Sequence, residues 1–373
     1  MTLDRNDREP LFHTAGHAQF FKIAAQLEAH RRPVSYTHLE TFGERVRVLR
    51  TDIFDPESLG EFCRASDLVI NAAGPSALIF DKVAQKALEA SAHYVDPSGN
   101  AKLFRQAMEK SGLIKEKGLT FVFYAGLSPG ISATYPLFLG EGLFDEVSSL
   151  DFFHAGGGKT TFNSAYDFIA SMNDGSSEGM MYWHEGQKKK WKAAVKEHHL
   201  PSPVGRVEAY PTLSHEYIQV AKRLSAATAR AYNAYTGKET LATLFNIQVF
   251  NQATTPGQLE ESSRKFMEAV NRDMEGRDPC FMLHVKMDGR KDGKRRKIIS
   301  TMRVDDTYQM IGKVLAHCAE KILAGSGHGP GCFLFHDAVD AAGVMELLEE
   351  TGIIPETCII EEKPGSTNIE GEI

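Results

Sequence analysis

Positions 71–75 hold the residues whose types best suit ligand chemistry. They read Asn71-Ala-Ala-Gly-Pro75 and follow an apolar run at 68–70. An apolar run that ends in very small side chains indicates a buried parallel strand entering a tight turn. Ligands bind at the carboxyl edge of open α/β sheets, where small side chains let a flat group lie against the backbone. We therefore predict that Asn71, Ala72, Gly74 and Pro75 bind a nucleotide cofactor, although a simple packing turn has the same composition.

Two later segments have a similar character. In the first, His93-Tyr-Val-Asp-Pro-Ser-Gly99, the residues Asp96 and Ser98 suit a ligand site, but equally a turn that caps a helix. The second contains Gly126, Pro129 and Gly130 and precedes residues 131–143, which have helical spacing. Free N–H groups at such a helix start attract anions such as a carboxylate. An interdomain hinge is the alternative, and both can be true.

The elements around these segments alternate between strands and helices. Such alternation predicts βαβ units and a doubly wound parallel sheet. The crossover at 39–45 is short for a helix, since parallel crossovers need about a dozen residues. We expect strands at 10–12, 34–36, 46–52, 67–71, 93–96 and 120–125, and helices at 18–30, 56–65, 79–91, 101–116 and 131–143.

The pattern changes after Gly130, where segments with period-two alternation indicate an α+β domain built on an antiparallel sheet. A glycine-containing connection between two of these segments predicts a β-hairpin. We expect strands at 148–154, 243–250, 280–287 and 297–304, and helices at 216–235, 258–275, 306–323 and 338–351.

The order and spacing of the three small-residue segments resemble the saccharopine dehydrogenase (saccharopine reductase-like) family. Its NADP-binding domain has an N-x-x-G-P turn, a Y-x-D-x-S-G stretch and a G-x-x-P-G segment, and each has a counterpart here. The resemblance covers about residues 10–350 and extends to the helix start at Tyr308. It implies a Rossmann-like fold with a first βαβ unit that is degenerate here. It also implies NAD(P)-dependent chemistry at the C–N bond of an amino-acid-like substrate, and a homodimer that pairs through the second domain.

The phosphate-binding loop departs from the dinucleotide fingerprint G-x-G-x-x-G. The corresponding segment, His13-Thr-Ala-Gly-His-Ala-Gln19, keeps only Gly16. A Cβ at the close-approach position displaces the phosphate, and left-handed geometry costs a non-glycine residue roughly 1–2 kcal/mol. The hydroxyls and histidine at 35–38, with Arg31 and Arg32 nearby, favour NADP over NAD. Because the phosphate-binding loop is eroded, we keep a second hypothesis, a non-catalytic binding or scaffold protein that has lost the cofactor.

Reduction of an imine, the chemistry that the resemblance implies, needs a proton donor beside the reacting nitrogen. His154, Lys159 and Tyr166 can each serve, and the sequence does not choose between them. The three glycines at 156–158, together with Lys159, can also hold a substrate carboxylate, although a flexible surface turn has the same composition.

Composition limits the remaining possibilities. The 373 residues carry a formal net charge of −7, which argues against a general nucleic-acid binder. No apolar run approaches the length of a membrane-spanning helix, and we expect no signal peptide, because the charged N-terminal residues include no apolar core. The five cysteines are scattered and suggest a reducing, cytoplasmic location, while the histidine pairs lack further ligands at metal spacing. Along the chain we predict a Rossmann-like domain at 1–130, a substrate and dimerisation domain at 131–335, a C-terminal helix at 336–360 and a disordered tail at 361–373.

Overall fold

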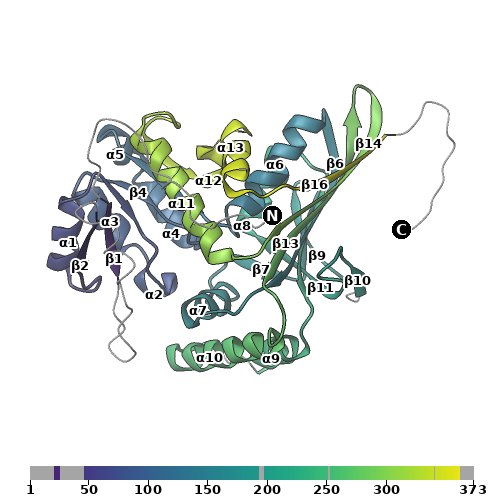
Figure 1. Cartoon of the computed structure of the whole chain (residues 1–373), viewed down its shortest axis with the longest axis horizontal. Helices are drawn as coiled ribbons and strands as arrows, with labels where there is room; N and C mark the ends of the chain where they lie inside the picture. Colours follow the sequence, from purple (N-terminus) through teal and green to yellow (C-terminus); the bar gives the residue numbers. More distant parts are fainter. Residues whose placement is uncertain (1–20, 26–45, 193–196, 251–252, 340, 362–373) are drawn as a thin grey trace, which may run out of the picture.

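The computed structural model describes residues 21–25, 46–192, 197–250, 253–339 and 341–361. Two main sheets of different construction lie side by side, with helices between them and around them (Figure 1). The strands expected at 10–12 and 34–36, the crossover at 39–45, Gly16 and almost all of the C-terminal tail lie outside these residues.

The first main sheet is parallel and has four strands. Its spatial order is β15 (Gly331–Leu334), β5 (Thr120–Phe123), β4 (His93–Val95) and β3 (Leu68–Ile70). The α/β class with a parallel sheet is therefore confirmed. The sequence analysis did not anticipate β15, which reaches this sheet from the C-terminal part of the chain.

Alternate residues of these strands enter two different apolar cores. Val69 and Tyr94 pack into one core, while Val95 and Val122 pack into the other. Both faces are buried, which explains why the strands are continuous apolar runs. The helices nearest this sheet are α1 (Pro56–Arg64), α2 (Ser76–Ile79), α3 (Lys82–Glu89), α4 (Ala101–Glu109), α5 (Ser111–Glu116) and α11 (Thr307–Leu323).

A separate parallel pair consists of β1 (Phe21–Ala25) and β2 (Val46–Arg50), in register from Phe21 opposite Val46. The strand β2 was predicted, but the helix expected at 18–30 is wrong at residues 21–25. Five residues are too few for hydrophobic spacing to separate helix from strand, and the pairing with β2 decides the outcome.

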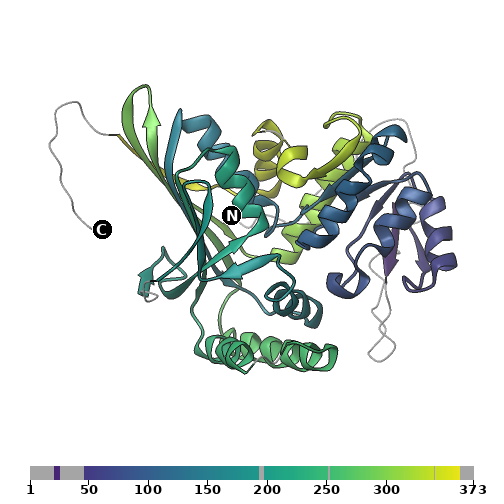
Figure 2. The same ribbon diagram turned by 180° about the vertical axis from the view of Figure 1, so that it is seen from behind.

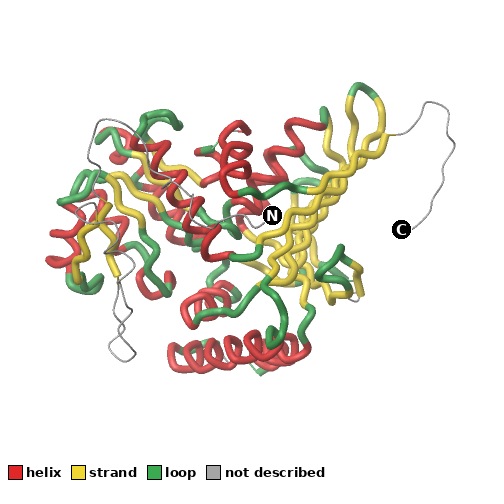
Figure 3. Tube along the Cα trace, viewed as in Figure 1, coloured by secondary structure: helices red, strands yellow, loops and turns green. Residues whose placement is uncertain are grey.

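The second main sheet is mixed and surrounds the long central strand β6 (Glu146–Gly157), as Figure 3 shows. Only the pairing of β6 with β12 is parallel among the ladders described for this sheet, so the sheet is not wholly antiparallel as predicted. Its other strands are β7 (Ser177–Gly179), β8 (Met181–His184), β9 (Gln187–Lys190), β10 (Glu197–His199), β11 (Arg206–Ser214), β12 (Thr228–Tyr235), β13 (Cys280–Lys291), β14 (Lys294–Val304) and β16 (Glu356–Glu361).

The predicted hairpin is confirmed between β13 and β14. Its loop is only Asp292-Gly293, and both residues have positive φ, 51° and 74°. This conformation matches the twist of the two strands and is favoured by an Asp-Gly pair.

Two elements of the second half differ from the prediction. The helix expected at 216–235 ends early, as α8 (His215–Arg223), and β12 follows it. Alanine-rich β12 carries little strand signal, because alanine favours helices. The strand expected at 243–250 lies in α9 (Lys238–Val249), whose buried Leu244 and Ile247 have helical spacing.

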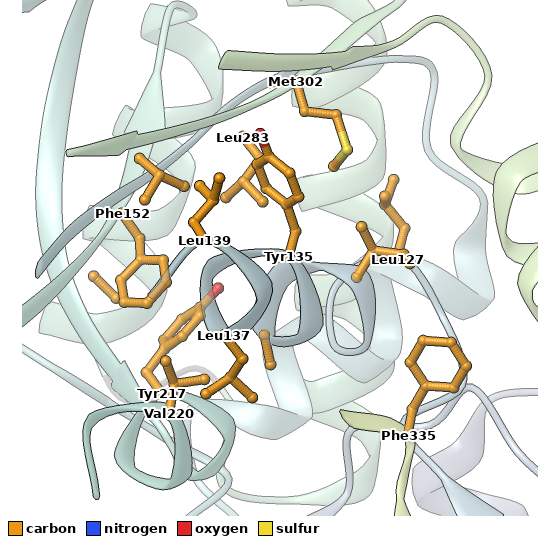
Figure 4. Packing of buried hydrophobic residues seen from close by; sticks show 14 of the residues in the cluster. Leu127, Tyr135, Leu137, Leu139, Phe152, Tyr217, Val220, Leu283, Met302 and Phe335 are labelled. Carbon is orange, nitrogen blue, oxygen red and sulfur yellow. The ribbon is translucent and has the colours of Figure 1, made fainter. Parts of the chain in front are cut away.

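The helix α6 (Ile131–Leu143) lies against the second sheet and is buried on most sides. Figure 4 shows Tyr135, Leu137 and Leu139 pointing in different directions from it, toward neighbours on the sheet and on α8. A helix that is apolar all round belongs in a core. The remaining helices are α7 (Phe162–Ser171), α10 (Pro256–Asp273), α12 (Phe335–Ala338) and α13 (Ala341–Thr351).

The view from behind shows α7, α9 and α10 grouped beside one end of the mixed sheet (Figure 2). Among the described residues, no helix is long and apolar enough to cross a membrane.

Candidate functional site

The carboxyl ends of β3, β4 and β5 meet at one edge of the parallel sheet, and α7 contacts this edge from the second half of the chain. The Asn163 side-chain amide donates to the Gly74 carbonyl oxygen at 3.1 Å. The Asp167 carboxylate accepts the N–H groups of Ser76 and Ala77 at 2.9 and 3.0 Å. The helix α7 therefore holds the turn at 71–75 from outside the parallel sheet.

Replacing Asp167 with alanine should loosen this contact. Burial raises the pKa of Asp167, although the Ser76 and Ala77 amides act to lower it. We expect Asp167→Ala to lower the free energy of unfolding by about 2 kcal/mol, because two amides lose their acceptor. Urea unfolding would measure this. Asp145→Ala is the matched control, since exposed Asp145 also accepts a backbone amide, from Asp292. Equal losses in both variants would contradict the role of Asp167.

Asn71, Tyr94 and Asp96 form a buried network just behind the turn. The Asn71 amide donates to the Tyr94 hydroxyl at 3.0 Å and to the Asp96 carboxylate at 2.9 Å. The Tyr94 hydroxyl and the Ser98 N–H also donate to Asp96, while Asn71 Oδ1 accepts the Ala73 N–H at 3.3 Å. Burial raises the pKa of Asp96, whose side chain is almost fully enclosed.

These contacts separate the predicted cofactor residues into two groups. Asn71 and Asp96 direct their polar atoms at the protein and hold the turn in place. Ala72, in contrast, is exposed, and Gly74 is half-buried. The small-residue surface that a flat ring needs is thus present at Ala72, and contact with a cofactor stays a prediction.

The segment Gly126 to Gly130 packs closely on itself and on the loop after β4. A Cβ on Gly126 would lie 3.0 Å from the Pro129 carbonyl oxygen and 3.4 Å from Pro97 Cβ. Gly130 has φ of 127°, and a Cβ there would overlap the Gly126 carbonyl oxygen. Close backbone packing therefore accounts for both glycines without a ligand.

The start of α6 holds a carboxylate that belongs to the chain itself. Glu216 accepts the Gly130 N–H at 2.6 Å and the Ser132 hydroxyl at 2.8 Å. Its side chain is buried, and burial raises its pKa to about 7. The anion expected at this helix start is therefore supplied by α8. The sequence alone does not reveal this role of Glu216, because an acidic residue in the first turn of a helix usually stabilises its own helix.

Of the predicted proton donors, His154 lies deepest. Its Nε2 contacts the Tyr217 hydroxyl, and its Nδ1 lies 3.4 Å from Ser128 Oγ. Burial lowers the pKa of His154 to about 4, so the ring is neutral at pH 7. A neutral, enclosed imidazole is poorly placed to deliver protons that must come from water.

Lys159 and Tyr166 lie on either side of the α7 N-terminus. Lys159 is exposed in the loop before α7, whereas Tyr166 is buried within it against Phe162. Burial raises the pKa of Tyr166. In the part of the chain that the structure describes, no hydrogen bond joins these two residues to each other or to His154.

The structure adds Tyr308, which the sequence analysis noted only as a helix start. Its hydroxyl accepts the Thr161 N–H at 3.2 Å and lies 3.2 Å from Ser164 Oγ, at the first turn of α7. Asn163, which contacts Gly74, belongs to the same turn of α7. The sequence could not reveal this contact, because residues 161 and 308 are far apart in the chain.

No group of three or more histidine, cysteine, aspartate or glutamate side chains with metal-binding geometry occurs among the residues with described positions. The groups that can face a cofactor are the backbone and small side chains of the turn, together with the polar first turn of α7.

Part of the chain matches a family model, and the chain resembles a solved structure in its fold. Residues 21–122 match the family model of the saccharopine dehydrogenase NADP-binding domain. The apo saccharopine dehydrogenase (L-Glu forming) of Saccharomyces cerevisiae is similar over 87% of this chain and 91% of that chain, with 15% identity and a TM-score of 0.63. The amine dehydrogenase of Mycobacterium smegmatis has 9% identity over 81% of this chain and 83% of that chain, with a TM-score of 0.39. No curated protein matches the sequence.

Proposed function

We propose that this protein is an NADP-dependent oxidoreductase, because residues 21–122 match the family model of the saccharopine dehydrogenase NADP-binding domain. It acts on the C–N bond of an imine or secondary amine in an amino-acid-like, carboxylate-bearing substrate. The observation that carries this proposal is the exposed small-residue turn at Ala72, at the carboxyl edge of a parallel sheet and braced by α7.

The residues at this edge fit a nicotinamide. Ala72 leaves the backbone open, while the enclosed Asn71 and Asp96 keep the turn rigid. A bound reduced nicotinamide supplies a hydride. The chain's residues then have to orient the substrate, exclude water and provide one proton.

The substrate carboxylate needs its own partner. The start of α6 is unavailable to it, because Glu216 accepts the Gly130 N–H. Lys159 lies on the exposed loop just before α7, four residues before Asn163. We assign the carboxylate to Lys159, which attracts it by charge.

The decisive test is a titration with NADPH and NADH, followed by nucleotide fluorescence and by thermal shift. We expect saturable binding with a preference for NADPH. Absence of binding at millimolar nucleotide would overturn the enzyme proposal and favour the alternative, a binding or scaffold protein with this fold. The eroded segment at 13–19 is the specific observation behind that alternative.

Substitution at the turn should locate the bound nucleotide. Ala72→Trp is expected to weaken NADPH binding about 100-fold, because the indole would fill the space of the ring. Ala65→Trp is the matched control, since Ala65 is also exposed but lies before the opposite, amino end of β3. Equal weakening in both variants, or none in Ala72→Trp, would place the cofactor elsewhere.

We also propose that the protein acts as a homodimer in a reducing, cytoplasmic environment. The edge strand β16 exposes Ile359 and Ile360, and α9 exposes Phe245, all of which a partner can cover. All five cysteines are unpaired thiols. Light scattering after size-exclusion chromatography tests the dimer.

A further inference from the structure

We propose that Tyr308 is the residue that exchanges a proton with the reacting nitrogen, and that the first turn of α7 is built to hold its phenolate. This inference rests on the proposed function and goes beyond it by naming the acid–base group and its support. The sequence resemblance includes Tyr308 only as a helix start, and neither it nor the comparisons assign a chemical role to this tyrosine.

The first step of the argument is position. Tyr308 lies in the first turn of α11, which packs across β3 and β4 of the parallel sheet. Its hydroxyl reaches the first turn of α7, where it contacts Thr161 and Ser164. Asn163 in the same turn of helix donates to the Gly74 carbonyl oxygen at 3.1 Å. One turn of helix rises about 5.4 Å. Because the Tyr308 hydroxyl and the turn at 71–75 both contact the first turn of α7, they are near neighbours.

The second step is the chemistry of the contacts. The Thr161 N–H is a backbone donor at a helix N-terminus, where partial positive charge favours an anion. Ser164 Oγ at 3.2 Å and Thr161 Oγ1 at 3.4 Å complete the group around the phenol oxygen. Partial burial acts to raise the pKa of Tyr308, but the hydrogen bonds to Ser164 and Thr161 outweigh it, so that the pKa is lowered. Two charged side chains lie close in sequence to the groups of this contact. Asp306, the N-cap of α11, is two residues before Tyr308, and Lys159 is two residues before Thr161.

The third step is a comparison with the other candidates. Tyr308 is 45% exposed, whereas His154 and Tyr166 are buried. A proton donor must be recharged from water in each turnover, and its pKa should lie near the working pH. Tyr308 is open to water and its pKa is lowered, whereas burial raises the pKa of Tyr166 and lowers that of His154.

The reaction balances with this assignment. As a hydride reaches the carbon of the C=N bond, the nitrogen takes the proton of the Tyr308 hydroxyl and becomes an amine. The resulting phenolate is held by the Thr161 N–H and regains its proton from water. In the opposite direction the phenolate removes the proton from the amine nitrogen.

The test is an ultraviolet titration of phenolate absorbance in the full-length protein, with and without saturating NADP⁺. We expect one tyrosine to titrate below its usual pKa of 10 in the wild type and to be missing in Tyr308→Phe. Saturating NADP⁺ should move that titration to lower pH, because a positive ring near the phenolate favours its charged form. A titration that NADP⁺ leaves in place would overturn the assignment.

Steady-state kinetics supplies a second readout, with NADPH oxidation followed against a panel of amino acids paired with oxo acids or aldehydes. Tyr308→Phe should lower kcat at least 100-fold and flatten its pH profile, while the Kd for NADPH stays within about twofold. Tyr210→Phe is the control, since Tyr210 donates to Glu208 on β11. Unchanged kcat in Tyr308→Phe would overturn the inference alone. Failure of the wild type to bind NADPH would overturn it together with the proposed function, and the titration decides even where no substrate pair turns over.

Discussion

Glu216→Ala should lower the free energy of unfolding by about 4 kcal/mol. The buried carboxylate is the acceptor for the Gly130 N–H and the Ser132 hydroxyl, and both donors are themselves buried. Each unsatisfied buried donor costs roughly 1–3 kcal/mol, and the truncation adds lost packing. Urea unfolding at pH 6 would measure the change. Glu216→Gln keeps an acceptor oxygen and should cost about half as much, so equal losses would contradict the hydrogen-bond explanation.

The same residue should make stability depend on pH. Burial raises the pKa of Glu216 from 4.5 to about 7 in the folded protein, so the folded state binds more protons than the unfolded state between these values. Its contribution is complete below pH 4.5 and is lost as pH rises through 7, a change of about 3 kcal/mol.

Two buried histidines act in the opposite sense. Burial lowers the pKa of His154 and of His284 to about 4, so their contributions increase as pH rises from 4 toward 6.5. The informative quantity is therefore the difference in unfolding free energy between wild type and Glu216→Gln, measured from pH 4.5 to 8. We expect this difference to fall with pH, and a constant difference would show that Glu216 does not titrate in this range.

Glu216 also shows where sequence analysis of a site reaches its limit. The glycines and proline before α6 correctly indicated a helix start that attracts a carboxylate. The carboxylate comes from Glu216, 86 residues later in the chain. Nothing in a local pattern distinguishes a distant side chain from a bound substrate, because both satisfy the same amides.

The fold was more predictable than the site. The strands β3, β4 and β5 are short apolar runs followed by small or turn-forming residues, so local sequence defines them. Alanine-rich β12 and five-residue β1 depend on their neighbours in the sheet, and their sequences favour helix. The strand β15 joins the parallel sheet through a pairing with β5 that spans some 200 residues, and no local signal reports such a contact.

The candidate site depends on contacts of this long-range kind. Asn71 and Gly74 could be proposed from the sequence because the turn is local, whereas the contacts of α7 with Gly74 and with Tyr308 are tertiary. The sequence therefore predicted the turn at this edge of the sheet, and ligand binding there stays a prediction. It could not identify the groups that the second half of the chain brings to that edge.

The second large effect is expected at Asp96, and it links stability to binding. Asp96→Ala removes the shared acceptor of the Tyr94 hydroxyl, the Asn71 amide and the Ser98 N–H. We expect a loss of about 4 kcal/mol in unfolding free energy, because three donors are left without their acceptor. Tyr94→Phe removes one donor to Asp96 and one of the two acceptors of the Asn71 amide, and should cost about 1–2 kcal/mol. Asp67→Ala, at an exposed position before β3, serves as the control.

The network should also couple to the cofactor, because Asn71 Oδ1 holds the Ala73 N–H and thereby the turn. A double-mutant cycle of Asn71→Ala with Asp96→Ala should give a coupling energy of at least about 1 kcal/mol, as expected for residues in one hydrogen-bonded network. Titration of Asp96→Asn, which preserves the shape of the side chain, should show NADPH bound about tenfold more weakly than by wild type, since a looser turn must be ordered when the nucleotide binds. Additive stability losses together with unchanged NADPH affinity would show that the network supports the sheet alone and has no part in positioning Ala72.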